Sequence, residues 1–377
     1  MERSLIKQIN KKNMAARLNS RHVKPMYYPN FFGVKRVTSL KWETLVGEKG
    51  APVIADVISF DASAPEKTRE VIGKMSGDIP KTAIKRSMTE SEYQEYKQLQ
   101  RDAQGDSDQL ELLNLGFKDT DFVHNGVRGR MEWASMQYMS RGGTNLTSSN
   151  NNGIVTTEFV GVGIPAANKK VSSVDWATAS TADGLQDIEN VLADAVKEGV
   201  SLRYIIMLTT EFSLLKKQKA TIDKIKGWIN QTSKVVITCQ IITINPALRI
   251  EDKNHKRTTI CPWVRKRICF LEDLRVGDIQ HGPIAAEDSE SLRKKALMVK
   301  KDFVLITKWS TEEPFKEWTK GEANAWPVVN DPEAIYILKA DGKAWAADEA
   351  TEGTDNIPAK FLGQEVEKEN LEAEDEE

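Results

Sequence analysis

The fold is decided by residues 119 to 143, which read DTDFVHNGVRGRMEWASMQYMSRGG. Apolar side chains recur at every third or fourth position of this stretch, which places them on one face of a helix: Val123, Val127, Met131, Ala134 and Tyr138. Asp119 or Thr120 can cap the start of this helix, and Gly142 and Gly143 can end it. The pattern predicts a long helix over residues 118 to 141, roughly 33 Å in length at about 1.5 Å per residue.

Beyond this helix the pattern alternates between helices and strands. Asp183 can cap a helix that stops at Gly199, and residues 202 to 208 are a continuous apolar run, as expected of a strand buried on both faces. A second helix is predicted to start at Thr209 or Thr210 and to continue, with apolar residues from Phe212 onward, as far as Ile229. Further strands are expected over residues 154–162, 235–242 (also buried), 303–309 and 334–340.

The segment before the long helix differs in character. Short apolar patches alternate with charged, glycine and proline residues from about Trp42 to Lys85, which predicts strands joined by turns but no core of its own. Residues 88 to 116 are polar and prone to form helix, with a break predicted at residues 106 to 108.

The two ends of the chain carry opposite charge, although the net charge of all 377 residues is only -2. Residues 1 to 41 contain ten Lys or Arg against one acid, a net of +9, whereas residues 346 to 377 contain twelve acids against two Lys, a net of -10. Both ends are therefore candidate interaction arms, unless they are merely solvated tails. In the basic arm, Tyr27, Tyr28, Phe31 and Phe32 are costly to leave in water, so this arm should dock on something.

The sequence contains no strong motif for catalysis, nucleotide binding or metal binding. The sequence lacks the phosphate-binding P-loop, the Gly-x-Ser-x-Gly elbow and any metal-binding spacing among its four histidines. Its three cysteines form no CxxC pair and are expected to be reduced and partly buried. No apolar run approaches the ~20 residues of a membrane helix, and the first residues do not resemble a signal peptide. We expect a protein of the cytoplasm that is not an enzyme and needs no cofactor or metal.

The order of these features resembles the E-type major capsid proteins of lambda-like tailed phages. The resemblance covers roughly residues 25 to 345 and rests on an ordered series of weak motifs: Tyr28-Pro29-Asn30-Phe31-Phe32, Ala51-Pro52-Val53, Val71-Ile72-Gly73, Phe270-Leu271-Glu272-Asp273, Val276-Gly277-Asp278, Phe303 to Trp309, and Asp331-Pro332-Glu333-Ala334-Ile335-Tyr336. The acidic tail after residue 345 departs from the family pattern, and its role stays open.

The resemblance implies an α+β fold of the Hong Kong 97-like type. The division it implies is an N-terminal arm (1–42), an extended loop (43–85), a peripheral domain with the long helix (86–174), an axial domain (175–300), peripheral strands (301–345) and the acidic tail (346–377). Such a chain is expected to assemble in the cytoplasm of a host bacterium into hexamers and pentamers of an icosahedral virion shell. Other copies of itself, scaffold, portal and decoration proteins, and double-stranded DNA packaged without sequence specificity are the expected partners, with no membrane.

Candidate residues for contacts between subunits lie in the two arms. They are Arg17, Arg21, Lys24, Tyr28, Phe31 and Phe32 in the basic arm, and Glu66, Lys67, Arg69 and Glu70 in the extended loop. Some members of this fold join a loop lysine to a neighbour's asparagine covalently. Lys67 or Lys74 and Asn324 or Asn330 lie in suitable regions, but we expect no cross-link here, because the charged loop around Lys67 keeps its amine protonated.

Three alternatives remain at the level of sequence. A cellular encapsulin-type compartment shares the fold and is the nearest of them. An enzyme built on the α/β lobe would be revealed by turnover or by a ligand at the ends of its strands. A nucleic-acid-binding protein that uses the basic arm would show steep salt dependence in its affinity for DNA.

Overall fold

The structure is a computed structural model that describes residues 4–6, 9–20, 25–46, 73–103, 105–146, 158–229, 239–251 and 256–346. Most of the predicted extended loop lies outside these ranges. No helix in the described ranges is both long and apolar enough to cross a membrane.

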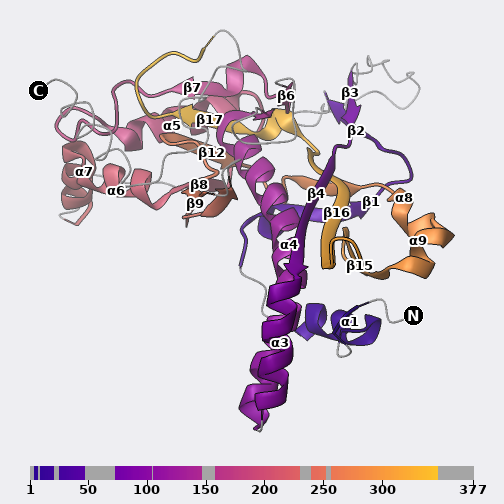
Figure 1. Cartoon of the computed structure of the whole chain (residues 1–377). Coiled ribbons are helices and arrows are strands. Elements are labelled where there is room, and N and C mark those ends of the chain that lie inside the picture. Colours follow the sequence, from indigo (N-terminus) through magenta and orange to yellow (C-terminus); the bar gives the residue numbers. More distant parts are fainter. Residues whose placement is uncertain are drawn as a thin grey trace, which may run out of the picture.

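A single long helix, α4 (Asp106–Arg141), runs through the centre of the molecule (Figure 1). Its 36 residues give about 54 Å at 1.5 Å per residue. The predicted start at Asp119 or Thr120 is wrong, because the turn of helix that carries these residues continues upstream to Asp106. The residues that were predicted to break the helix, 106 to 108, instead lie in its first turn.

A shorter helix, α3 (Glu90–Asp102), precedes α4. The hydroxyl of Thr89 accepts a hydrogen bond from the backbone N–H of Glu92, and the Glu92 carboxylate accepts one from the backbone N–H of Thr89. This reciprocal capping box fixes the point at which the chain leaves the preceding strand and turns into helix.

A six-stranded sheet packs against one side of α4. Its path is β1-β13-β16-β15-β14, and β4 pairs with the long strand β16 beside that path. The strands are β1 (Phe32–Arg36), β4 (Lys81–Thr89), β13 (Gly277–His281), β14 (Leu297–Lys301), β15 (Val304–Thr311) and β16 (Lys316–Val329). All neighbours are antiparallel except β1 and β13. The predicted strand at 303 to 309 is thereby confirmed as β15.

The glycine at position 126 lets β4 approach α4 closely. A Cβ atom there would lie 2.9 Å from the Cδ1 atom of Ile84 on β4, closer than packed carbon atoms tolerate. Glycine costs about 1 kcal/mol of intrinsic helix propensity, and here the close contact between helix and sheet explains why it is present.

A second sheet and three helices form the α/β lobe at the upper left of Figure 1. The sheet order is β7-β17-β12-β8-β9. Its elements are β7 (Lys169–Val171), α5 (Gly184–Lys197), β8 (Tyr204–Leu208), α6 (Thr209–Lys217), α7 (Lys219–Ile229), β9 (Gln240–Ile244), β12 (Arg267–Leu271) and β17 (Tyr336–Lys339). The Asp183 cap is confirmed, because its carboxylate accepts the backbone N–H of Gln186. The buried strand predicted at 202 to 208 is confirmed in part, as β8 (Tyr204–Leu208).

Two predictions for this lobe are wrong. The second helix is interrupted at Gln218, whose buried side chain accepts the backbone N–H of Gly184 at 2.7 Å and turns the chain out of the helix. The strand predicted over residues 235 to 242 is described only from Gln240 onward. Within the described chain, this strand, β9, lies at the edge of the sheet. Four of its five residues are exposed or half-buried, so it is not buried on both faces.

Three short hairpins and several short helices complete the described chain. The hairpins pair β2 (Lys41–Val46) with β3 (Gly73–Asp78), β5 (Gly143–Leu146) with β6 (Glu158–Gly161), and β10 (Leu248–Glu251) with β11 (Arg257–Ile260). The helices are α1 (Lys11–Ser20), α2 (Tyr28–Phe31), α8 (Ala285–Asp288), α9 (Glu290–Lys295), η1 (Ala166–Asn168) and η2 (Pro332–Ala334). The predicted strands at 154 to 162 and 334 to 340 are confirmed in part, as β6 and β17.

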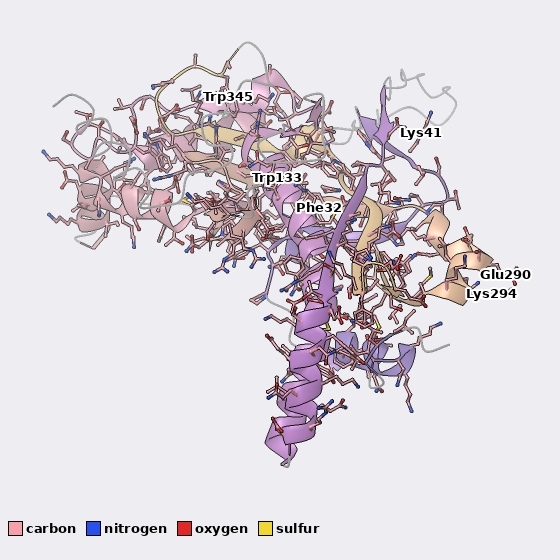
Figure 2. All side chains as sticks on the ribbon, in the orientation of Figure 1. Phe32, Lys41, Trp133, Glu290, Lys294 and Trp345 are labelled. Carbon is pink, nitrogen blue, oxygen red and sulfur yellow. The ribbon has the colours of Figure 1, made fainter. Side chains whose placement is uncertain are left out.

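The buried apolar side chains form two clusters. One surrounds α4 and the six-stranded sheet, and the other lies inside the α/β lobe. At the C-terminal end of the described chain, the indole N–H of Trp345 donates to the carbonyl oxygen of Lys170 at 2.9 Å, and the ring lies against the cations of Arg267 and Lys339. Trp345 thus fixes the point from which the acidic tail departs (Figure 2).

Candidate assembly surfaces

The aromatic part of the basic arm docks on the long helix of its own chain. The Glu132 carboxylate of α4 accepts the backbone N–H groups of Tyr27 at 3.0 Å and Tyr28 at 2.7 Å. Burial raises the pKa of Glu132, and the two backbone hydrogen bonds partly offset this effect. The side chains of Tyr28, Phe31 and Phe32 are buried in the core around α4.

This burial concerns three of the candidate contact residues. In the isolated chain, Tyr28, Phe31 and Phe32 are at most 4% exposed, so their side chains stabilise the subunit itself. Figure 2 shows Phe32 in the crowded centre of the molecule, and Phe32 belongs to the same buried core as Trp133 of α4. As contacts between subunits, these three residues stay predictions. The prediction that the arm docks is confirmed, and its docking partner is its own subunit.

Of the seven other candidate residues, the structure describes only Arg17. Arg17 forms an ion pair with Asp121 of α4 at 3.2 Å and donates to the Asn114 side chain at 2.8 Å. The remaining candidates lie outside the described residues: Arg21, Lys24, Glu66, Lys67, Arg69 and Glu70. As contacts between subunits they stay predictions.

The β2–β3 hairpin lies at the edge of the molecule, beside the six-stranded sheet (Figure 1). Its strands pair in register from Lys41 with Asp78 to Val46 with Gly73. Residues 47 to 72, which join the two strands, lie outside the described ranges. The described part of the predicted extended loop therefore consists of these two paired strands and the residues that follow them.

A groove of about 1250 Å³ opens beside α4. Its floor is the α4 face around Gly126 and Trp133, one wall is β4 from Thr82 to Lys85, and the other wall is the β10–β11 hairpin. Pro25, Met26, Tyr27 and Asn30 of the docked arm also line it. The groove therefore combines a helix face that is partly apolar with walls made of strands.

The β4 wall presents an open strand edge. Within the described chain, β4 pairs with β16 along one edge and with no strand along the other. Lys81, Ala83 and Lys85 are exposed at alternate positions along this strand. An open edge of this kind offers backbone N–H and C=O groups to an added strand.

The groove carries charge of both signs with a small excess of cations. Lys85, Arg130, Arg249 and Arg257 line it, against Glu132 and Glu251. Arg257 and Glu251 pair with each other at 2.7 Å across the β10–β11 hairpin. Sequence reasoning missed this hairpin, although the alternation of apolar and polar residues in Leu248–Glu251 was a signal of a strand.

Two kinds of chemistry can be assessed among the described residues, metal binding and thiol reactivity. Among them, no three His, Cys, Asp or Glu side chains gather closely enough to hold a metal ion. Burial raises the pKa of the Cys261 thiol to about 11 and raises that of Cys269 as well, which makes both poor nucleophiles at neutral pH. All three cysteines are free thiols, as predicted.

Comparisons with known proteins agree with this architecture. The sequence model of the family described as phage major capsid protein E matches residues 12–340. A search of curated protein sequences found no match. A solved structure described as a prophage capsid protein of Escherichia coli CFT073 superimposes with a TM-score of 0.56 at 12% identity, covering 88% of this chain and 99% of that one. At such low identity the likeness concerns the fold alone.

Two further solved structures are less similar. A phage-related protein from Bordetella bronchiseptica RB50 gives a TM-score of 0.48 at 10% identity and covers 91% of this chain and 99% of that one. An encapsulin from Synechococcus elongatus PCC 7942 gives 0.41 at 8% identity and covers 89% and 97%. These two scores are too low to decide between a phage shell and a cellular compartment, whereas the family match covers most of the chain. The predicted α+β fold of the Hong Kong 97-like type is confirmed, and the chain belongs to the phage major capsid protein E family as a structural protein of the capsid shell.

Proposed function

We propose that this chain assembles with copies of itself into hexamers and pentamers of a closed icosahedral shell around phage double-stranded DNA. The observation that carries the proposal is the family match over residues 12–340. Assembly takes place in the cytoplasm of the host bacterium, and the chain acts there as a structural protein without catalytic activity. Scaffold, portal and decoration proteins are its further partners, and the packaged DNA is contacted without sequence specificity.

The proposed division of the chain follows the ranges expected from the sequence. The axial domain (175–300) is supported by the separate apolar core of the α/β lobe, and the peripheral domain (86–174 with 301–345) by the core around α4. The extended loop (43–85) is supported by the β2–β3 hairpin at the molecular edge. For the N-terminal arm (1–42) and the acidic tail (346–377), the strong and opposite charges support a role in contacts.

The extended loop of one subunit is proposed to lie in the groove of the next. Its segment Ala51-Pro52-Val53-Ile54-Ala55-Asp56-Val57-Ile58-Ser59-Phe60 is apolar and rich in β-branched residues, so it suits a partly apolar floor and an open strand edge. The charged residues Glu66, Lys67, Arg69 and Glu70 would then set the register between subunits, as surface charges commonly do.

Electron microscopy of the purified protein, with its scaffold if one is required, tests the proposal. Because one chain must make several quasi-equivalent contacts, closed shells tens of nanometres across are expected. Nuclease-protected DNA inside shells from infected cells separates a phage capsid from a compartment that encloses protein cargo. A protein that stays a monodisperse monomer under all assembly conditions contradicts the proposal.

A further inference from the structure

A fully buried ion pair lies at the end of the six-stranded sheet that is nearest to α1. The Lys308 ammonium on β15 lies 3.0 Å from the Glu317 carboxylate on β16, and both side chains are 0% exposed. The ammonium makes this ion pair without a well-aligned hydrogen bond. Removing two charges from water is costly, so such a pair is stable only if other groups satisfy its remaining lone pairs.

The first residues of the chain supply those groups. The hydroxyl of Ser4 donates to Glu317 Oε1 at 2.7 Å, and the backbone N–H of Leu5 donates to Glu317 Oε2 at 3.2 Å. The backbone N–H of Ile6 donates in turn to the Ser4 hydroxyl at 3.3 Å, which holds that side chain in place. Residues more than 300 positions away in the sequence thus complete the hydrogen bonding of one buried carboxylate.

The following residues attach the same segment to three further elements. Ile6 and Ile9 are buried beside Gly116 of α4, and Met14 and Leu18 of α1 are buried in the same core. The hydroxyl of Tyr93 on α3 donates to the Leu5 carbonyl oxygen at 3.3 Å. Lys301 of β14 donates to the Asn19 side chain at 2.9 Å, and Arg17 pairs with Asp121 of α4 as described above.

We infer that residues 4–6 and 9–20 form a detachable strap that locks this end of the sheet to α3 and α4 by completing the buried Lys308–Glu317 pair. Release of the strap is coupled to unfolding of α1, because α1 contains only ten residues and a helix of that length is not stable in water without a surface to pack on. When the strap is released, α1 unfolds, and Glu317 loses two hydrogen bonds that nothing else within the described chain provides. The strap is therefore an internal lock of the subunit, which must open before these residues can reach another copy.

Hydrogen exchange of the full, unassembled chain tests this inference on single elements. Two variants release the strap by unrelated routes: Ser4→Ala removes a hydrogen bond to Glu317, and Gly116→Leu fills the space that Ile6 and Ile9 occupy without touching the ion pair. A Cβ atom added at position 116 would lie 3.4 Å from the Cδ1 atom of Ile9, so the rest of a leucine side chain would displace Ile9. Ser20→Ala, at an exposed serine of the same strap, is the matched control.

Both releasing variants are expected to speed exchange about tenfold in α1 and also in β15 and β16 around the ion pair, because one hydrogen bond to a charged group is lost or the strap is displaced. Exchange in α5, which belongs to the other core, stays unchanged, as does every segment in Ser20→Ala.

If exchange rises in α1 alone, the strap does not lock the sheet, and if it rises nowhere, the strap is not held by these contacts. Either result overturns the inference. Should Gly116→Leu unfold the whole chain, Ser4→Ala alone decides. Since no shells need to form, failure here is distinct from failure of the proposed capsid function.

Discussion

The indole N–H of Trp326 on β16 donates a hydrogen bond of 2.6 Å to the hydroxyl oxygen of Tyr138 on α4. Both side chains are buried, and burial raises the pKa of the Tyr138 hydroxyl, which therefore stays protonated at every ordinary pH. Tyr138 belongs to the apolar stripe that predicts the long helix, so this bond ties the helix to the longest strand of the sheet. This hydrogen bond is a buried polar contact between the helix and the strand.

The Tyr138→Phe variant is expected to lower the free energy of unfolding by about 1 to 3 kcal/mol, because it leaves the indole N–H of Trp326 buried without its acceptor. Urea denaturation at neutral pH measures the change. In a double-mutant cycle with Trp326→Phe, the second substitution should cost less in the Tyr138→Phe background than in the wild type. Strictly additive losses would show that the bond contributes nothing.

Stability should fall between pH 6.5 and pH 4 because of His124. Burial lowers the pKa of this side chain from 6.5 to about 4, and the neighbouring Arg128 cation acts in the same direction. In the unfolded chain His124 takes up a proton as the pH falls below 6.5, whereas in the folded chain it stays neutral until about pH 4. The free energy of unfolding therefore falls progressively in this window, by about 3 kcal/mol in total. Above pH 6.5 His124 is neutral in both states and causes no such loss.

The His124→Phe variant keeps a ring in the site and cannot titrate. Denaturation curves at pH 7.5 and pH 4.5 should show a smaller loss of stability for this variant than for the wild type. Asp121, Asp302 and Lys301 also face His124, and their charges are common to both proteins. An equal loss in the two proteins would mean that His124 is not the titrating group.

Local patterns in the sequence predicted much of the fold. The Asp183 cap, the apolar run of β8 and the stripe on α4 are set by neighbours in sequence, and each is found where the pattern places it. The start of α4 was not predicted correctly. Acidic residues at 106 to 108 suit either a turn or the first turn of a helix, and only the surrounding structure selects between them.

Contacts between distant residues account for most of what was missed. Gln218 ends α6 because its side chain bonds to Gly184, which no local pattern reveals. No sequence pattern singles out Glu132, yet its carboxylate holds the backbone of Tyr27 and Tyr28. For the same reason, the sequence predicted that the basic arm would dock but did not reveal where.

The groove beside α4 gives a direct test of the proposed loop contact. Ala247 lines the groove, and its side chain is exposed, so Ala247→Trp should leave the melting temperature nearly unchanged while its ring occupies the groove. The concentration needed for assembly is expected to rise about tenfold, which corresponds to about 1.4 kcal/mol. Light scattering and electron microscopy measure this concentration.

Ala193→Trp is the matched control, since Ala193 is exposed on α5, outside the groove. It should assemble at nearly the wild-type concentration. Normal assembly of Ala247→Trp would show that the groove is not a contact between subunits. Replacement of Glu66, Lys67, Arg69 and Glu70 by alanine tests the same contact from the side of the loop.

We expect mature shells to contain no covalent cross-link between subunits. To join a lysine to an asparagine, the amine must lose its proton, attack the side-chain amide and expel ammonia, with a carboxylate to accept the proton. Bringing a lysine from its reference pKa of about 10.4 to neutrality near pH 7 costs about 4.6 kcal/mol. The charged sequence around Lys67 offers no apolar site that would lower this cost.

The asparagine side of the reaction is equally unfavourable. The Asn324 side chain is nearly buried, and its amide nitrogen donates to the Pro283 carbonyl oxygen at 2.6 Å. Glu322 lies two residues earlier on the same face of β16. Burial raises its pKa, but hydrogen bonds from Lys320 and Lys81 outweigh burial and lower it overall, which makes this carboxylate a weak base. Boiled mature particles should therefore run on a denaturing gel near the 42.3 kDa of the single chain, whereas a ladder of multimers would refute the prediction.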